Sequence, residues 1–450
     1  MSATSRFAAI DLTYHLRAGA AMLADRALMD SDRFTFTAAG ARWLNQQWLA
    51  QVIMAGVLDA GGWLALAALR ALLVGLVAWL VMQTARARGA DERGAAWLAL
   101  ASAALTLPAL GLRPQLFGAA CFALSAWLLF GHQARPGRLW LLVPVAACWA
   151  NVHGTFPLLF VLGGAALLED VVTRGGRWRL LSAVGVTALA ATLVNPHGGE
   201  IWAYVAGLTS NPFVTSSVDE WQRPSFSSWS GAAFLASIPL VVLAMARSRA
   251  RAPWPLTLAL GGFLLLGLMA TRGILWWGLF APVVLASGMA AAAVTLPTAR
   301  SLASTALAWT FVLLAAAGLG RWLPWRSAAP VPSRLISAAP PGVTDALLRV
   351  LAPGDRIFNA QVWGSWFEYA LPANPVAVDS RIELIPASVW EDYGRVSRAD
   401  EGWREVLDAW DVRALAVSAV QQPHLLLRLE DDAVWMRVHG DADGAVFARR

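Results

Sequence analysis

The sequence predicts an all-α membrane bundle of about ten spans, followed by a small water-soluble α/β domain. Of the 450 residues, 58% are hydrophobic and only 14% are charged, whereas soluble domains carry about 25% charged residues. Apolar runs of about 20 residues, the length of a helix that crosses a bilayer, recur between residues 63 and 323. Beyond residue 343 the runs stop, and short segments typical of a soluble domain begin.

Short loops separate the ten apolar runs. Those at 138–150 and 155–172 are short for a bilayer of about 30 Å, so we expect them to be kinked, tilted or partly re-entrant. The ten runs lie near residues 63–85, 94–111, 114–131, 138–150, 155–172, 179–194, 229–246, 255–271, 274–296 and 303–323.

Arginines alternate between the loops and predict the topology. All 35 basic residues are arginine, and every second loop is rich in them. Because cytoplasmic loops carry the excess of basic residues, we place these loops in the cytoplasm. Residues 1–62 and the chain beyond about residue 323 then lie outside. Because the arginines lie in short loops, where they determine the membrane topology, the net charge of +6 does not indicate a nucleic-acid partner.

The segments outside the bundle complete the predicted organisation. We expect a first outer segment with interfacial helices (1–62), a transmembrane domain (63–323), a Pro- and Ser-rich linker (324–342) and an extracytoplasmic α/β domain (343–450). An outer segment normally follows a span or a signal peptide. Because only ten residues precede Asp11, we expect a further span upstream of this sequence.

Secondary structure in the predicted α/β domain follows from alternating strand and helix patterns. Strands are expected at 355–359, 375–379, 413–417 and 433–439, and helices at 343–352, 362–370, 386–395, 401–410 and 421–429.

Acidic residues in the first outer segment are candidates for chemistry. Asp11 and His15 stand four residues apart and share one face of a helix. The pair can act as a base or bind a cation, or it can only pin the helix. Asp30 and Asp32 flank Ser31, and two carboxylates at this spacing can hold Mg²⁺ or Mn²⁺ together with a phosphate. Asp32 can equally cap a turn.

Other polar residues gather in the loops that we place outside. Arg113 opens an apolar run and can pair with a phosphate group, or extend to the lipid headgroups. Polar groups beside a bilayer are costly unless they serve a purpose, although outer loops must be polar in any case. The other candidates in these loops are His153, His197, Glu220 and Arg272.

Several short motifs lie along the chain: Asp11-x-x-Tyr14-His15, Asp32-Arg-Phe-Thr-Phe-Thr37, Gln47-Trp48-Leu49, Arg113-Pro114-Gln115, Trp149-Ala-Asn-Val-His153-Gly154, Asn195-Pro196-x-Gly198, Glu220-Trp221, Trp363-Gly364-Ser-Trp366 and Asp379-Ser-Arg381. With these motifs the sequence resembles a widespread family of bacterial multi-span proteins. This family is similar to the GT-C superfamily of glycosyltransferases, which includes protein mannosyltransferases and oligosaccharyltransferases.

The resemblance implies an inverting glycosyltransferase of the bacterial inner (plasma) membrane. It would transfer a sugar from a polyprenyl-phosphate donor, on the outer face, to a glycan, lipid or protein acceptor. Asp11 best matches the catalytic acidic residue of the first outer loop, and Asp32 comes second. The resemblance also implies a possible divalent cation. The residues that would bind the substrate and its phosphate are His15, Arg113, His153, His197, Glu220 and Arg272.

Two other functions stay open. The protein can be a non-catalytic envelope protein that binds or presents lipid-linked glycans. It can also be a transporter or flippase, which would need polar groups within the spans. The spans are nearly free of such groups.

Overall fold

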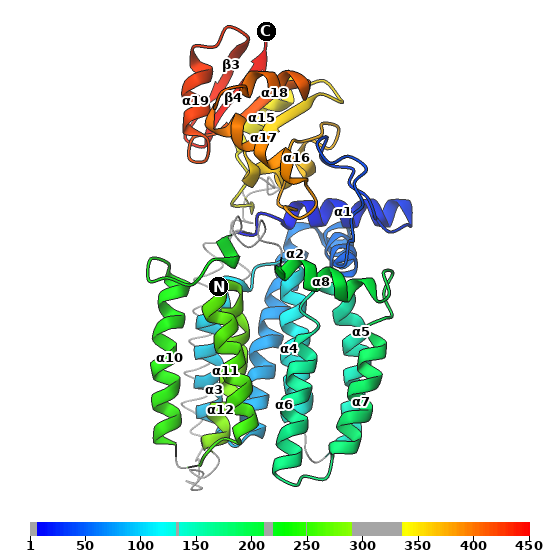
Figure 1. Cartoon of the computed structure of the whole chain (residues 1–450), viewed down its shortest axis with the longest axis vertical. Coiled ribbons are helices and arrows are strands. Elements are labelled where there is room, and N and C mark those ends of the chain that lie inside the picture. The colour runs from blue at the N-terminus through cyan, green and yellow to red at the C-terminus, as the bar shows by residue number, and fades with distance from the viewer. Residues whose placement is uncertain (1–6, 132–134, 211–218, 249, 290–334) are drawn as a thin grey trace. The chain divides into compact units, whose positions relative to one another are not determined.

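The computed structural model describes residues 7–131, 135–210, 219–248, 250–289 and 335–450. Contacts divide the chain into two compact units. We call residues 67–323, with the first four residues, the helical unit. Residues 5–66 and 324–450 form the mixed unit. Figure 1 shows the parallel helices of the first unit and the sheet of the second.

The helical unit contains apolar helices where the first nine runs were predicted. Its tenth predicted run, 303–323, lies outside the described residues. The helices are α2 (Trp48–Ala87), α3 (Glu92–Thr106), α4 (Pro114–Phe130), α5 (Leu142–Val152), α6 (Leu158–Val172), α7 (Trp178–Ala191), α8 (Glu200–Ser210), α10 (Trp229–Arg247), α11 (Trp254–Met269) and α12 (Ile274–Met289). Short 3-10 turns are η1 (Leu107–Ala109), η2 (Pro136–Leu141), η3 (Asp219–Trp221) and η4 (Thr271–Gly273).

Three helical segments in the described part of the chain are long and apolar enough to cross a membrane: α2, α10 and Thr271–Met289. The last of these includes α12, which is buried almost throughout between α3 and α11. Its Phe280 ring lies 5.0 Å from that of Phe263 on α11, centroid to centroid. Aromatic and aliphatic packing therefore holds the centre of this unit.

A buried ion pair joins Arg88, the residue directly after α2, to Glu169 of α6. Arg88 Nη2 lies 2.5 Å from Glu169 Oε1, and both side chains are less than a tenth exposed. Arg88 Nε also donates to Ser287 Oγ of α12 at 2.9 Å. This arginine therefore ties three helices together.

A break divides α2 where the two units meet in the sequence. Gly61 and Gly62 have non-helical backbone angles, and the φ of Gly62 is +65°, a value that glycine adopts without a steric penalty. The predicted interfacial helix at 48–60 is thus the first part of α2. It belongs to the mixed unit.

The mixed unit contains a four-stranded sheet in the order β1-β2-β4-β3. β1 (Arg356–Asn359) and β2 (Val412–Ser418) are parallel, and β4 (Gly444–Arg449) pairs antiparallel with β2 and with β3 (Trp435–Gly440). The helices of this part are α15 (Pro341–Val350), α16 (Gln361–Ala370), α17 (Ala387–Arg398), α18 (Trp403–Ala409) and α19 (Pro423–Glu430).

These elements confirm the predicted helices and three of the four predicted strands. The fourth predicted strand, 375–379, forms only isolated bridges, in which Val376 pairs with Ile357 of β1 and with Thr35. β4 was not predicted, because its short apolar run follows a turn at the end of the chain.

The N-terminal segment is part of this same unit rather than a separate one. α1 (Leu12–Asp25) packs on α16. The extended backbone at Thr35 lies beside Val376, and the Phe7 amide donates to the Leu335 carbonyl at 2.8 Å. The sequence predicts residues 1–62 and 343–450 as two segments, and their described residues belong to one compact unit. Residues 324–334 of the predicted linker lie outside the described residues.

Candidate functional site

Asp11 and His15 lie together at the start of α1, as their spacing predicts. Asp11 is the N-cap residue and is 8% exposed, while His15 is 1% exposed. The His15 Nε2 atom lies 3.7 Å from Asp11 Oδ2, a polar contact that is too long for a hydrogen bond. A carboxylate beside an imidazole can accept a proton from a hydroxyl group.

The first part of α2 and the turn before it supply the groups behind this pair. Gln51 Nε2 lies 3.1 Å from His15 Nδ1, and Gln51 Oε1 accepts a hydrogen bond from Asn45 Nδ2 at 2.7 Å. The two helices come close at Gly19, where a Cβ atom would overlap the Gln51 carbonyl oxygen. Glycine at this position therefore lets α1 lie against α2.

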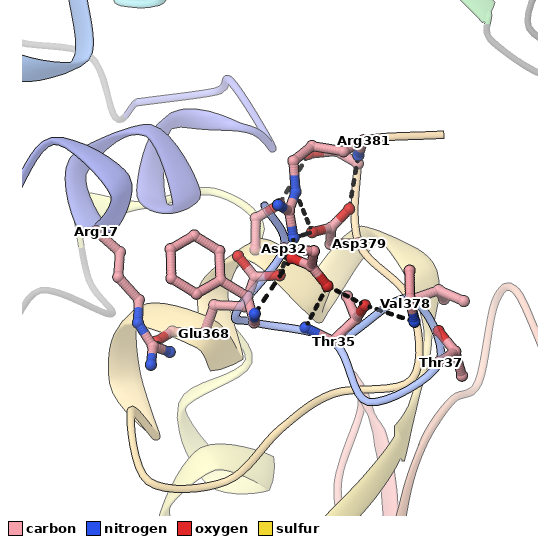
Figure 2. A network of polar contacts seen from close by, with 12 residues as sticks. Arg17, Asp32, Thr35, Thr37, Glu368, Val378, Asp379 and Arg381 are labelled. Atoms are coloured by element: carbon pink, nitrogen blue, oxygen red, sulfur yellow. Dashed lines mark hydrogen bonds and ion pairs between the residues drawn. The ribbon is translucent and has the colours of Figure 1, made fainter. Parts of the chain in front are cut away.

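Asp32 lies in a different cluster, around Arg381 (Figure 2). Arg381 Nη2 lies 2.7 Å from Asp32 Oδ1 and 3.5 Å from Glu368 Oε1. Its Nε donates to Asp379 Oδ2 at 2.6 Å. All four side chains are at most 1% exposed. One buried cation thus meets three carboxyl groups.

Aromatic rings enclose the guanidinium group of Arg381. Its Cζ atom lies 5.5 Å from the ring centroid of Tyr14, 5.1 Å from that of Phe34 and 4.8 Å from that of Trp43. Cation–π attraction strengthens when water is excluded. Arg17 adds a further tie, because its guanidinium donates to backbone carbonyl groups near the end of α16.

Both oxygens of Asp32 are engaged, so the turn-capping interpretation describes it. Asp32 Oδ2 accepts from the Thr35 amide at 3.1 Å and from Thr35 Oγ1 at 2.5 Å, and Oδ1 accepts from the Phe34 amide at 3.2 Å. Asp30 is exposed. Among the described residues, no group of three or more His, Cys, Asp or Glu side chains could hold a metal ion. Asp30 and Asp32 therefore do not fit a divalent-cation site.

Burial sets the protonation of the Arg381 cluster. It raises the pKa of Glu368 well above the usual value, and the nearby negative charge of Asp379 raises it further. Burial opposes the charge of Asp379 as well, but Arg381 holds the pKa of Asp379 below its usual value. Glu368 is thus the group that retains a proton.

Glu368→Gln is expected to flatten the pH dependence of stability. Above the ordinary glutamate pKa of 4.5, the folded protein binds a proton at Glu368 that the unfolded chain releases. The free energy of unfolding of the wild type therefore falls as pH rises through this window. Glutamine mimics the protonated acid and removes this component. Melting temperatures measured from about pH 5 to about pH 8 test this, with Glu405→Gln as an exposed control. Parallel profiles for the wild type and Glu368→Gln would contradict it.

In the helical unit, three predicted residues meet. Arg113, the N-cap residue of α4, forms an ion pair with Glu220 Oε1. Arg272 Nη2 lies 3.2 Å from Glu220 Oε2, and its guanidinium lies 4.5 Å from the Trp221 ring centroid. Thr271 Oγ1 donates to the Glu220 carbonyl at 3.0 Å. Each charged side chain is between a fifth and two fifths exposed, so the cluster is accessible.

The two predicted histidines of this unit lie in turns. His153 is the C-cap residue of α5, and its Nδ1 lies 2.9 Å from Thr155 Oγ1. A Cβ atom on Gly118 of α4 would lie 3.3 Å from the His153 Cβ. The His197 amide donates to Asn195 Oδ1 at 2.7 Å in the turn before α8.

Sequence reasoning missed the partners of the predicted residues. Asp379 and Arg381 were matched to a motif without a role, and Glu368 and Gln51 were not considered. A polar residue in an apolar helix was the available signal for Gln51, which is 0% exposed. Arg70 is likewise a polar residue in an apolar stretch of α2, where it is 4% exposed. It is an exception to the statement that the predicted spans are nearly free of polar groups.

Solved structures share this fold. ArnT from Cupriavidus metallidurans in the apo state is 15% identical with a TM-score of 0.57, and the alignment covers 99% of this chain and 95% of that one. The same protein bound to undecaprenyl phosphate gives a TM-score of 0.54 over 99% and 94% of the two chains, at 15% identity.

Two further proteins match in structure. Archaeoglobus fulgidus AglB with an inhibitory peptide and a dolichol-phosphate has 12% identity and a TM-score of 0.55, covering 99% of this chain and 71% of that one. The arabinofuranosyltransferase AftD from Mycobacteria has 17% identity and a TM-score of 0.53, over 99% and 38%. No protein-family profile and no curated protein sequence matches the chain. The chain therefore shares a GT-C-like fold with these solved structures.

Proposed function

We propose that the protein is an inverting membrane glycosyltransferase that takes its sugar from a polyprenyl-phosphate donor. The observation that carries this proposal is the convergence of Arg113 and Arg272 on one carboxylate, that of Glu220. Two guanidinium groups aimed at one small anion are suited to a phosphate group. Support also comes from the fold, since ArnT is solved with undecaprenyl phosphate and AglB with a dolichol-phosphate.

The positions of the two arginines suit a lipid-linked phosphate. Arg113 precedes the apolar helix α4, and Arg272 lies in the first turn of the apolar segment Thr271–Met289. Charged groups at the ends of apolar helices lie at the level of lipid headgroups. An isoprenoid chain can therefore stay in the bilayer while its phosphate reaches the arginines.

We assign the role of general base to Asp11. In an inverting transfer, the acceptor hydroxyl oxygen bonds to the anomeric carbon while the bond from that carbon to the donor phosphate oxygen breaks. Asp11 would accept the hydroxyl proton, and the bonding electrons would leave with the donor phosphate. Asp32 is less suited to this role, because Arg381 and Thr35 engage its carboxylate.

The proposed reaction does not depend on a divalent cation. AglB is solved in complex with Zn and sulfate, but the predicted ligands Asp30 and Asp32 do not fit such a site here. We therefore derive no step through a metal ion.

The proposal includes the predicted topology. About ten spans would cross the bacterial plasma membrane, with the arginine-rich loops in the cytoplasm. The mixed unit and the Arg113–Glu220–Arg272 cluster would then lie on the outer side.

Binding of undecaprenyl phosphate tests the proposed phosphate site. Arg113→Ala and Arg272→Ala, in the full chain in lipid nanodiscs, are each expected to weaken binding by about tenfold or more, since each loses a charge-assisted hydrogen bond. Arg223→Ala removes an exposed arginine that lies three residues after Glu220 and is expected to bind like the wild type. If both folded variants bind undecaprenyl phosphate with wild-type affinity, Arg113 and Arg272 are not its phosphate ligands. Their ion pairs with Glu220 would then only connect the turns that carry them.

A non-catalytic protein that binds or presents lipid-linked glycans is the second candidate. The burial of Asp11 and Asp32, which are 8% and 2% exposed, favours it, because a general base must reach its substrate. Undecaprenyl-phosphate binding without sugar transfer from any lipid-linked donor would support this alternative.

A further inference from the structure

A chain of buried polar groups runs from Asp11 into the contact between α1 and α2. Its members are Asp11, His15, Gln51 and Asn45, and the last three are 1%, 0% and 3% exposed. The contacts join His15 Nε2 to Asp11, His15 Nδ1 to Gln51 Nε2, and Gln51 Oε1 to Asn45 Nδ2. Buried polar groups of this kind are costly unless they are satisfied. The arrangement therefore constrains which atom carries each proton.

The amide groups determine the orientation of this chain. An amide NH₂ group only donates and an amide oxygen only accepts. Asn45 Nδ2 lies 3.9 Å from Met22 Sδ, and a thioether sulfur accepts hydrogen bonds but cannot donate them. This contact favours an Asn45 NH₂ group that faces Met22 and Gln51. The Gln51 oxygen then accepts from Asn45, and the Gln51 NH₂ group faces His15.

The orientation of the Gln51 amide determines the tautomer of His15. Because Gln51 donates to His15 Nδ1, that nitrogen must carry a lone pair, and the ring proton of a neutral imidazole must lie on Nε2. The Nε2 atom is the one that lies 3.7 Å from the Asp11 carboxylate. With the opposite tautomer, a lone pair would face the carboxylate and a proton would face the Gln51 NH₂ group. Both contacts would then be repulsive.

We propose that Gln51 is a positioning residue, which holds His15 in the neutral Nε2–H tautomer so that the ring directs its N–H toward Asp11. This rests on the proposed function in one respect, namely that Asp11 is the base. The oriented N–H would then face the carboxylate that acts as the base. The His15 Nε2–Asp11 Oδ2 contact of 3.7 Å is longer than a hydrogen bond, and catalytic contacts of this kind shorten when substrate binds.

Nitrogen-15 NMR of histidine-labelled full-length protein in nanodiscs tests the tautomer directly. The His15 signals, assigned by their loss in His15→Gln, are expected to show a protonated Nε2 and an unprotonated Nδ1. In Gln51→Glu the carboxylate accepts rather than donates, so Nδ1 is expected to become protonated. The control Gln46→Leu removes another buried amide, which is 4% exposed, and is expected to leave the His15 signals unchanged. A proton on Nδ1 in the wild type would overturn the proposal.

Sugar transfer separates this proposal from the proposed function. Gln51→Glu is expected to lower the transfer rate at saturating donor by about tenfold or more, because a catalytic histidine in the wrong tautomer slows the Ser-His-Asp enzymes strongly. The affinity for undecaprenyl phosphate is expected to be unchanged. If the tautomer changes and no variant, Asp11→Asn included, alters transfer, the role of Asp11 fails while the tautomer assignment stands. If transfer falls in Asp11→Asn but not in Gln51→Glu, Gln51 is not a positioning residue.

Discussion

Arg381→Ala is expected to destabilise the mixed unit more than the loss of any exposed ion pair. Arg381 is 1% exposed and lies against Asp32, Asp379 and Glu368. Its removal leaves buried carboxylates without a counter-charge, which costs about 3–5 kcal/mol in other proteins. It also opens a space among three aromatic rings. Denaturant unfolding of the full chain, followed by tryptophan fluorescence, measures the change in the free energy of unfolding.

A matched arginine provides the control for this experiment. Arg398 pairs with Asp400 at 2.8 Å, but its side chain is 64% exposed. Exposed ion pairs contribute about 0–1 kcal/mol, so Arg398→Ala is expected to unfold almost like the wild type. Equal losses of stability in the two variants would show that the buried cluster does not hold this unit together. Arg381→Lys is expected to fall between them, because it keeps the charge and loses the planar fork.

Much of the fold followed from local patterns in the sequence. Apolar runs of bilayer length predict helices by composition alone, and nine of the ten runs coincide with helices of the described chain. The strands and helices of the C-terminal part could be predicted for the same reason, because their patterns depend only on residues close in the sequence. The packing of α1 on α16 could not follow from such patterns, since it joins segments that lie far apart in the sequence.

The candidate residues show the same limit. The sequence identified Arg113, Glu220 and Arg272 as unusual polar groups in apolar surroundings, but not that one carboxylate joins both arginines. For Asp32 the spacing to Asp30 suggested a metal ligand. The structure instead places Arg381 beside it, and a partner that is distant in the sequence leaves no local signal. Residue type thus indicated where chemistry is available, whereas the tertiary contacts decided what each group does.

Asp11→Asn is expected to slow sugar transfer by several orders of magnitude while leaving the fold and donor binding intact. Asparagine has nearly the same shape as aspartate but cannot take a proton from the acceptor hydroxyl. Loss of a general base slows a reaction by about 10²–10⁴-fold. The expected result is a fall of this size in transfer from a polyprenyl-phosphate sugar to acceptors in bacterial membranes. Undecaprenyl phosphate should bind with wild-type affinity, because its proposed ligands are Arg113 and Arg272.

Asp25→Asn is the matched control, since Asp25 ends the same helix α1 and its side chain is 48% exposed in an ion pair with Arg33. It is expected to transfer sugar at the wild-type rate. If Asp11→Asn transfers sugar as fast as Asp25→Asn does, Asp11 is not the base, and its contact with His15 serves to hold α1 in place. If transfer is absent even in the wild type while undecaprenyl phosphate still binds, the burial of Asp11 shows that it is not a catalytic residue. The protein then binds a lipid-linked glycan without reacting with it.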